Sequence, residues 1–316
     1  MSDKTAIEWA DSTWNPVTGC TKVSPGCDNC YAETFSERFR GTPGHYFEGG
    51  FDIQFRPDKL DQPLRWKKPR RIFVNSMSDL FHNDIPDEYI AKVWAVMGLA
   101  RHHTFQVLTK RHGRMQALLS SPSFPELIAK CNPIWPEGFS LALPLPNVWL
   151  GVSTEDQKWA DIRVPALLDT PAAVRFISAE PLLGPIDLRD HLPHFTDLGS
   201  PPSLDWVIVG GESGHNARPM HPAWATSLRD QCATAEVPFL FKQWGEWGPC
   251  APYDQASGVY DFRHGRGISL DGTLCMPGER QGNAREGLAI IFRAGKKSTG
   301  RVLDGRTWDG YPGDAA

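Results

Sequence analysis

The βα pattern of this chain is clearest in "RIFVNSMSDLFHNDIPDEYIAKVWAVMGLARHHTFQVLTK", residues 71–110. Its two ends, 71–77 and 104–110, are apolar runs of strand length, rich in β-branched and aromatic residues. The segment 86–100 begins with proline and carries apolar residues at helical spacing. Strand, helix and strand in this order predict a βαβ unit with two parallel strands.

The same pattern recurs along the chain. Further strand-like runs lie at 147–153, 173–180, 205–212 and 238–245, and "TAIEWADSTWN" (5–15) predicts a strand before them. A helix is predicted at 221–235, and 155–170 is a weaker helical segment. Six or seven βα units favour an α/β fold with a parallel (βα) barrel or partial barrel over a doubly wound sheet.

Two organisational expectations follow. Residues 1–245 are expected to form the barrel domain, and 246–316 a C-terminal elaboration packed on it, with hairpin-like turns and no βα unit. The Pro- and Gly-rich segments 40–63 and 120–146 are longer than ordinary connections, so we expect lids or rim walls there.

Charge and hydropathy exclude some classes of protein. The net charge is −4 and the pI about 6.2, which argues against a global positive field for nucleic acid. The basic segments 65–71 and 109–114 either bind phosphate locally or are solvated surface. The first residues lack the apolar run of a signal peptide, and no stretch approaches the ~18 apolar residues of a membrane helix. We therefore expect a cytoplasmic protein without membrane contact, in which clustered cysteines hold a metal rather than disulfides.

Three of the seven cysteines lie in "TGCTKVSPGCDNCYAETF", residues 18–35. Cys20, Cys27 and Cys30 are separated by six and then two residues, and the nearest histidine is His45. A structural zinc site needs four ligands, so zinc requires a distant fourth residue. Chance clustering is a further alternative. We favour a 4Fe-4S cluster held by three thiolates, because it leaves one iron open to an external chelator, and a helix beginning near Cys30 would stabilise the thiolate charge.

Nearly every predicted strand ends in polar residues. In a parallel barrel these ends meet on one rim, where active sites are built. A loop-capping role is the simpler explanation for any single position, so the inference depends on their convergence. The strand-end residues are Asn75, Ser76, Ser78 and Asp79; Thr109, Lys110 and Arg111; Ser153 and Glu155; Ser178 and Glu180; Glu212 and Ser213; and Lys242 and Gln243.

A cysteine loop that follows a first strand and ends in "CDNCYA" resembles the radical SAM superfamily, where the open iron chelates S-adenosylmethionine. The blocks "STWNPVTGCTKVSPGCDNCYAE", "RIFVNSMSDLFH", "NVWLGVSTE", "VIVGGESG" and "LDGRTWDGYP" more closely resemble an uncharacterised phage- and prophage-associated family that is considered radical-SAM-like. This likeness extends over nearly the whole chain. The sequence departs from the superfamily pattern in its six-residue first spacer and in Asn29, which stands where an aromatic residue commonly precedes the last cysteine.

The resemblance implies reductive cleavage of S-adenosylmethionine to a 5′-deoxyadenosyl radical, which abstracts hydrogen from a substrate. It implies Ser76 and Asp79 at the amine, although Asp79 is equally a helix cap, and Lys110 or Arg111 at the carboxylate or a substrate phosphate. The other implied cofactor contacts are Tyr31, Ser153 and Glu155, and the implied catalytic, substrate-facing residues are Glu180, Glu212 and Lys242. The glycines beside Glu212, in "GGESG", are expected to let a ligand approach closely.

The substrate does not follow from the sequence. Phage association and the basic segments favour DNA, a nucleotide or a modified base, and the chemistry requires an electron donor such as flavodoxin or ferredoxin. Two other functions stay open: a zinc-stabilised nucleic-acid-binding or adaptor protein, and an iron–sulfur protein of the same fold that has lost catalysis.

Overall fold

The computed structural model describes residues 5, 7–131, 142–193, 201–251, 253–254, 259–260, 265–275 and 287–313. The chain divides into two compact units. Unit 1 consists of Met1–Val152 and Arg163–Phe176, and unit 2 of Ser153–Ile162 and Ile177–Ala316. The domain boundary expected at residue 245 remains a prediction.

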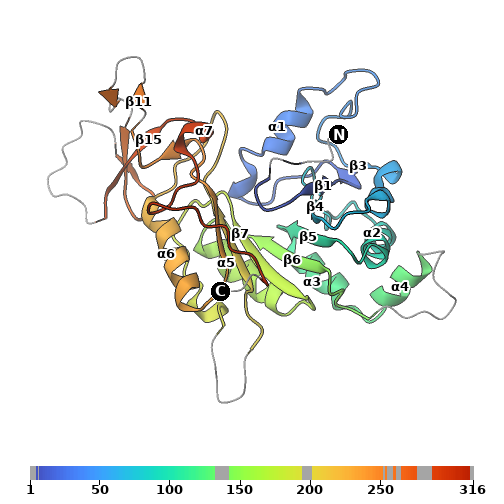
Figure 1. Ribbon diagram of the computed structural model, residues 1–316. Coiled ribbons are helices and arrows are strands. Elements are labelled where there is room, and N and C mark those ends of the chain that lie inside the picture. Colours follow the sequence, from blue (N-terminus) through green and yellow to red (C-terminus); the bar gives the residue numbers. More distant parts are fainter. Residues whose placement is uncertain are drawn as a thin grey trace. The chain divides into compact units, whose positions relative to one another are not determined.

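A seven-stranded sheet has the strand order β1-β4-β5-β6-β7-β8-β9 (Figure 1). The registers of β1 with β4, β4 with β5, β5 with β6, and β8 with β9 are parallel. In the described part of the chain the order ends at β1 and β9, so the sheet is open rather than a closed barrel. The predicted α/β class is confirmed, and of the two predicted forms the open sheet agrees with the partial barrel. The strands are β1 Ser12–Trp14, β4 Arg71–Val74, β5 Thr104–Thr109, β6 Val148–Ser153, β7 Val174–Ala179, β8 Trp206–Gly210 and β9 Phe239–Gln243.

The predicted helices are present. α2 (Asp87–Leu99) connects β4 and β5 in sequence, and it begins after Pro86 with two acidic residues in its first turn, where the helix dipole favours negative charge. Its buried Trp94 packs edge-on against Phe81 and Phe124, with ring centroids 5.8 Å apart in each pair. α6 (Pro222–Thr234) and the weaker segment, α5 (Gln157–Leu168), are also helical. In the described ranges, no helix has both the length and the apolar character needed to cross a membrane.

Smaller elements complete unit 1. β2 pairs antiparallel with β3, and α1 follows the last clustered cysteine directly. These elements are β2 Val17–Thr18, η1 Pro25–Cys27, α1 Tyr31–Glu37, β3 Gln54–Phe55, η2 Pro57–Lys59, η3 Gln62–Arg65, α3 His112–Leu119 and α4 Phe124–Lys130.

The cysteine loop is anchored at its start. The Gly19 N–H donates to Met77 O at 2.9 Å, and the Cys20 N–H donates to Phe51 O at 3.1 Å. Gly19 has φ +91°, and a Cβ there would lie 2.1 Å from Asp52 O. Only glycine combines this left-handed backbone with so close an approach. The loop therefore starts from a fixed point beside the turn that follows β4.

The C-terminal part of unit 2 is antiparallel. A four-stranded sheet has the order β10-β15-β13-β14, and β11 pairs with β12. The predicted hairpin turn near "GRGISLDGT" is confirmed by the antiparallel pairing of β13 and β14. The elements are η4 Arg189–His191, β10 Trp247–Gly248, β11 Tyr253–Asp254, β12 Val259–Tyr260, β13 Gly265–Ile268, β14 Leu274–Cys275, β15 Ala289–Arg293 and α7 Lys296–Thr299.

The last described residues cover the edge of β9. The Phe241 N–H donates to Trp308 O at 3.0 Å, and the Gly310 N–H donates to Phe239 O at 3.1 Å. An uncovered edge strand presents unpaired backbone groups to other chains. The tail therefore satisfies backbone groups that would otherwise be exposed.

Replacing Gly19 with alanine tests the anchor of the cysteine loop. We expect Gly19→Ala to lower the free energy of unfolding by more than about 2 kcal/mol, because it adds backbone strain and a clash with Asp52. Urea unfolding measures this. Gly113 in α3 is the control, since a Cβ there meets no atom within 4 Å, and alanine should stabilise the helix by up to about 1 kcal/mol. Equal effects of the two substitutions on the free energy of unfolding would contradict the role of Gly19 as the anchor of the cysteine loop.

Candidate metal and cofactor site

The three clustered cysteines lie near one another in unit 1. Cys20 follows Gly19, Cys27 ends η1, and Cys30 immediately precedes α1; all three are half-buried. The Cys27 thiol is close enough to the other two to raise the pKa of each electrostatically. Among the described residues, no group of three or more His, Cys, Asp or Glu side chains forms a ready site for a metal ion.

Cys30 occupies the start of a helix, as the sequence predicted. The backbone N–H groups of Ala32 and Glu33 lie close enough to its thiol to act on its pKa. Burial raises the pKa of Cys30, whereas these N–H groups and the nearby charge of Lys110 act to lower it. Free N–H groups in a first helical turn stabilise negative charge. The position therefore offsets part of the cost of a buried thiolate.

Cys20 has a different compensating group. Burial, and after it the Asp79 carboxylate, raise the pKa of its thiol to about 11. Arg111 opposes both, because its Nη1 lies 3.5 Å from Cys20 Sγ and donates a hydrogen bond to the sulfur. A cation is thus held directly against this thiol.

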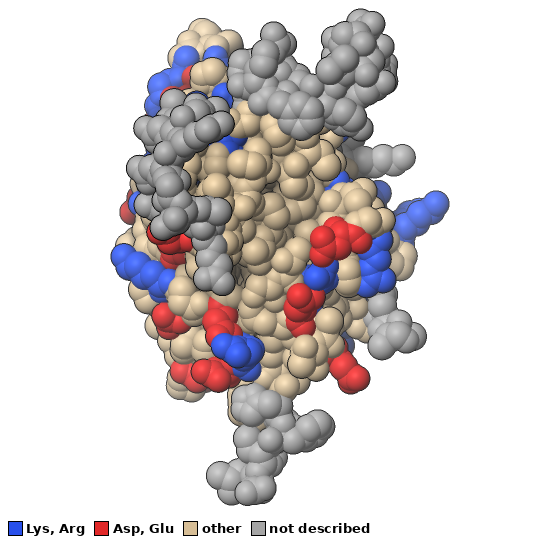
Figure 2. Space-filling model, turned by 90° about the vertical axis from the view of Figure 1, so that its left-hand side faces the viewer, with Lys and Arg blue, Asp and Glu red and all other residues tan. Residues whose placement is uncertain are grey.

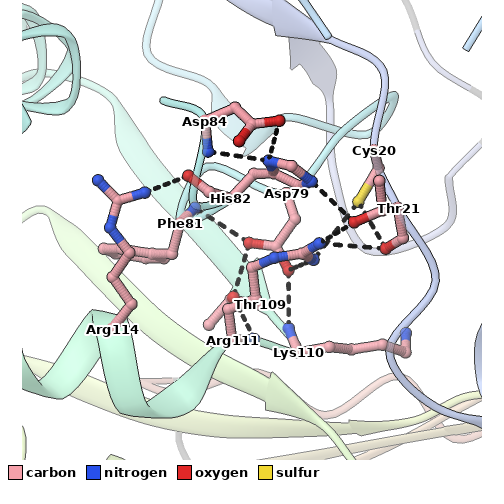
Figure 3. A network of polar contacts seen from close by, with 10 residues as sticks. All are labelled: Cys20, Thr21, Asp79, Phe81, His82, Asp84, Thr109, Lys110, Arg111 and Arg114. Carbon is pink, nitrogen blue, oxygen red and sulfur yellow. Dashed lines mark hydrogen bonds and ion pairs between the residues drawn. The ribbon is translucent and has the colours of Figure 1, made fainter. Parts of the chain in front are cut away.

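The Asp79 carboxylate is the centre of the polar network drawn in Figure 3. Oδ1 accepts from the Phe81 N–H at 3.0 Å and from the Thr109 hydroxyl at 2.7 Å. Oδ2 accepts from the Lys110 N–H at 3.0 Å and lies 3.5 Å from Arg111 Nη1. A carboxylate has about four acceptor positions, and protein groups occupy all of them here. Asp79 is therefore committed to contacts within the protein.

The helix-cap alternative for Asp79 is wrong. The residues after it form turns rather than a helix, so its bond to the Phe81 N–H closes an Asx turn.

Arg111 is held in place by the cysteine loop. Its Nη2 donates to Thr21 O at 3.1 Å and to Thr21 Oγ1 at 2.8 Å. His82 Nδ1 accepts from the Asp84 N–H, so Nε2 carries the proton and donates to the same hydroxyl at 2.8 Å. Burial lowers the pKa of His82, which favours the neutral ring. The resemblance implied Lys110 or Arg111 as the partner of a cofactor carboxylate. The Arg111 guanidinium is instead bound by groups of the protein itself.

Lys110 points elsewhere. Its side chain extends away from the Asp79 carboxylate in Figure 3, and its charge acts on Cys30. The two cations at the end of β5 thus act on different thiols: Arg111 on Cys20 and Lys110 on Cys30.

Tyr31 and Ser76 meet beside the cysteine loop. The Tyr31 hydroxyl donates to Ser76 O at 2.6 Å, although the Tyr31 side chain is largely exposed. Ser76 Oγ donates to Asn15 Oδ1 at 3.2 Å. The two predicted cofactor residues are therefore neighbours.

Asn75, one of the predicted strand-end residues, has surroundings that the sequence did not reveal. It directly follows β4, with φ +59°, and is only 3 % exposed, yet neither atom of its amide has a hydrogen-bond partner. A buried amide without partners is costly unless a ligand satisfies it. Asparagine tolerates left-handed backbone, but its burial and its lack of partners are visible only in the fold.

The predicted catalytic residues lie in unit 2. Lys242 Nζ contacts both oxygens of Glu180, at 2.7 and 3.0 Å. Gln243 Nε2 donates to Glu180 Oε1 at 3.4 Å and to Ser213 Oγ at 3.1 Å, and its buried Oε1 has no partner. The ends of β7, β8 and β9 therefore meet through these side chains, as expected for strand ends.

Glu212 forms a different ion pair, with Arg218. The Arg218 guanidinium binds both of its oxygens, with Nη2 at 2.6 Å from Oε1 and Nε at 2.9 Å from Oε2. The expectation that the glycines beside Glu212 admit a ligand stays a prediction, although Gly211 has a structural role. A Cβ on Gly211 would lie 1.9 Å from Trp244 O, and one on Gly245 would lie 2.1 Å from Glu212 O. Gly211 and Gly245 therefore allow two loop backbones to come into contact.

Ser153 and Glu155 are interior residues of unit 2. They are 2 % and 0 % exposed, and Glu155 O accepts from the Leu183 N–H at 2.7 Å. The end of β6 is thus packed inside the unit.

The basic segment 65–71 is partly used for structure. Arg65 pairs with Asp61, and Arg70 donates to Ser12 Oγ while stacking over the Trp66 ring. On the face drawn in Figure 2, Lys and Arg are interspersed with Asp and Glu among the described residues. Phosphate binding by this segment stays a prediction.

The reactivity of the thiols should depend steeply on pH. In the reduced, metal-free protein, alkylation of Cys20 should rise about tenfold per pH unit between about pH 8 and 10, because the thiol stays largely protonated below its pKa of about 11. Peptide mapping by mass spectrometry after timed iodoacetamide treatment measures the rate. A plateau near about pH 8.5, the ordinary pKa of cysteine, would show that burial does not protect the thiol.

Comparison with known proteins identifies the family of this chain. No curated protein and no solved structure matches the chain. The family described as "Protein of unknown function (DUF5131)" matches residues 4–312, which is nearly the whole sequence. The chain therefore belongs to the DUF5131 family.

Proposed function

We propose that this protein is a radical S-adenosylmethionine enzyme whose 4Fe-4S cluster is held by Cys20, Cys27 and Cys30. The observation that carries the proposal is the grouping of these three half-buried thiols beside two cations at the end of β5. Three thiolates leave one iron of such a cluster without a protein ligand. When bound, the reduced cluster would supply the electron that cleaves the cofactor and generates the hydrogen-abstracting radical.

The donor set fits a cluster by its chemistry. Thiolates are the usual ligands of iron–sulfur clusters, and here burial alone would keep two of the three thiols protonated. The N–H groups of the first turn of α1, Lys110 and Arg111 each stabilise the deprotonated forms that metal binding requires.

Residues near the cysteine loop are suited to hold the cofactor. We assign the cofactor carboxylate to Lys110, whose positive charge lies near Cys30 in the cysteine loop. Ser76 and the unsatisfied amide of Asn75 supply polar groups at the end of β4. Asp79 acts indirectly, by holding Arg111.

In unit 2 we assign substrate contacts to Glu180 and Lys242, supported by Gln243 and Ser213. The Glu212–Arg218 pair would organise the loop after β8. A nucleic acid or nucleotide substrate, a flavodoxin- or ferredoxin-like electron donor and a cytoplasmic location belong to this proposal.

Anaerobic reconstitution with iron and sulfide tests the proposal. We expect about four irons and four sulfides per chain, and release of 5′-deoxyadenosine when the reduced protein receives S-adenosylmethionine. Zinc in place of iron would favour the zinc-stabilised alternative. A bound cluster and cofactor without product would favour the non-catalytic iron–sulfur protein.

Single cysteine substitutions test which thiols bind iron. Cys20→Ala, Cys27→Ala and Cys30→Ala should each abolish stable iron retention, measured by metal analysis after gel filtration. Cys131→Ala is the matched control, because Cys131 is also half-buried in unit 1, and Cys232→Ala tests a buried thiol. Loss of iron in either control would show that the wrong thiols are assigned.

Asn75 offers a test of the cofactor contact. Asn75→Gly suits the left-handed backbone and removes the amide, so we expect the cluster to remain while S-adenosylmethionine binds about tenfold more weakly. Equilibrium dialysis of the reconstituted protein measures the affinity. Unchanged affinity, with thermal stability maintained, would remove Asn75 from the site.

A further inference from the structure

We propose that Arg111 is a positioning residue for the cluster: it fixes the sulfur of Cys20 and raises the reduction potential of the cluster through a hydrogen bond to that sulfur. This inference rests on the proposed function, because it requires a cluster at Cys20. It assigns to Arg111 a role other than the ligand or substrate contact expected from the sequence.

The geometry leaves Arg111 little freedom. Nη1 lies 3.5 Å from both Cys20 Sγ and Asp79 Oδ2, and Nη2 donates to the carbonyl and the hydroxyl of Thr21. Its own N–H donates to Thr109 Oγ1 at 2.8 Å. The guanidinium is therefore clamped between the turn after β4 and the cysteine loop, as Figure 3 shows.

Low exposure strengthens the electrostatic effect. The side chains of Arg111 and Asp79 are 10 % and 9 % exposed, so water screens them weakly. Hydrogen bonds to the sulfurs of a cluster and nearby positive charge both stabilise the reduced, more negative state. Removing the donor should therefore make the cluster harder to reduce. It should also loosen the loop that carries Cys20.

The same network contains a matched arginine that does not touch sulfur. Arg114 donates to the carbonyl groups of His82 and Ile85 and pairs with Asp87 at 2.7 Å. Arg114 lies in α3, and Arg111 lies directly before this helix. Both side chains contact the turns after β4. A purely structural role for Arg111 predicts equal consequences when either arginine is removed.

The experiment compares Arg111→Gln, Arg111→Lys and Arg114→Gln with the wild-type protein, each reconstituted anaerobically. Dye-mediated redox titration followed by electron paramagnetic resonance gives the midpoint potential, and loss of iron to a chelator gives the stability of the cluster. We expect Arg111→Gln to lower the potential and to release iron about tenfold faster, the effect of losing a charge-assisted hydrogen bond. Arg111→Lys keeps the charge but cannot make all the contacts, so its potential should be intermediate.

The outcomes separate this inference from the proposed function. An unchanged potential and iron-release rate in Arg111→Gln, or equal changes in Arg114→Gln, would overturn the role of Arg111 alone. A wild-type protein without a cluster would overturn the proposed function and this inference together. If Arg111→Gln fails to fold, Thr21→Val serves in its place, because it removes one hydrogen-bond acceptor of Arg111. An unchanged iron-release rate in Thr21→Val, together with an unchanged potential in Arg111→Lys, would overturn the inference.

Discussion

The contacts around the Asp79 carboxylate organise the candidate site. This single side chain joins the turn after β4 to the end of β5, through Thr109, the Lys110 backbone and the Arg111 guanidinium. Breaking a buried ion pair by removing one partner typically costs about 3–5 kcal/mol, because the other charge remains uncompensated. The position of Arg111, and with it the Thr21 and Cys20 end of the cysteine loop, depends on this pair.

The cysteine loop combines two opposing effects. Burial disfavours the thiolate forms of Cys20 and Cys30, whereas helix N–H groups, Lys110 and Arg111 favour them. The helix N–H groups and Lys110 act on Cys30, and Arg111 acts on Cys20, so the loop stabilises negative charge at two separate positions. That arrangement suits a multi-iron cluster, whose thiolate ligands bind different irons, and it gives a physical basis for the function that we propose.

Much of the fold could be predicted from the sequence because strand and helix patterns are local. The runs at 71–77 and 104–110 became β4 and β5, and 86–100 became α2. The weak helical segment, α5, contains Pro165, which obscured its pattern. The closure of a barrel was not predictable, because strand order at the ends of a sheet depends on contacts distant in sequence.

The candidate site was less predictable than the fold. The three cysteines and the helix after Cys30 follow from spacing and composition. The hydrogen bonds of the Asp79 carboxylate do not follow from the sequence. Two of their donors are backbone N–H groups, whose positions depend on the turn and on the register of β5. Nor could the sequence predict the different partners of Lys110 and Arg111. The two residues are adjacent at a strand end, and their side chains find different partners only when the cysteine loop is folded beside them.

The most direct test of the central claim is Mössbauer spectroscopy of anaerobically purified protein enriched in the active iron isotope, with and without S-adenosylmethionine. Three thiolates and one open iron predict that the signal of one iron in the cluster changes when the cofactor binds. Spectra that the cofactor leaves unchanged, or protein that holds no cluster iron, would contradict the account.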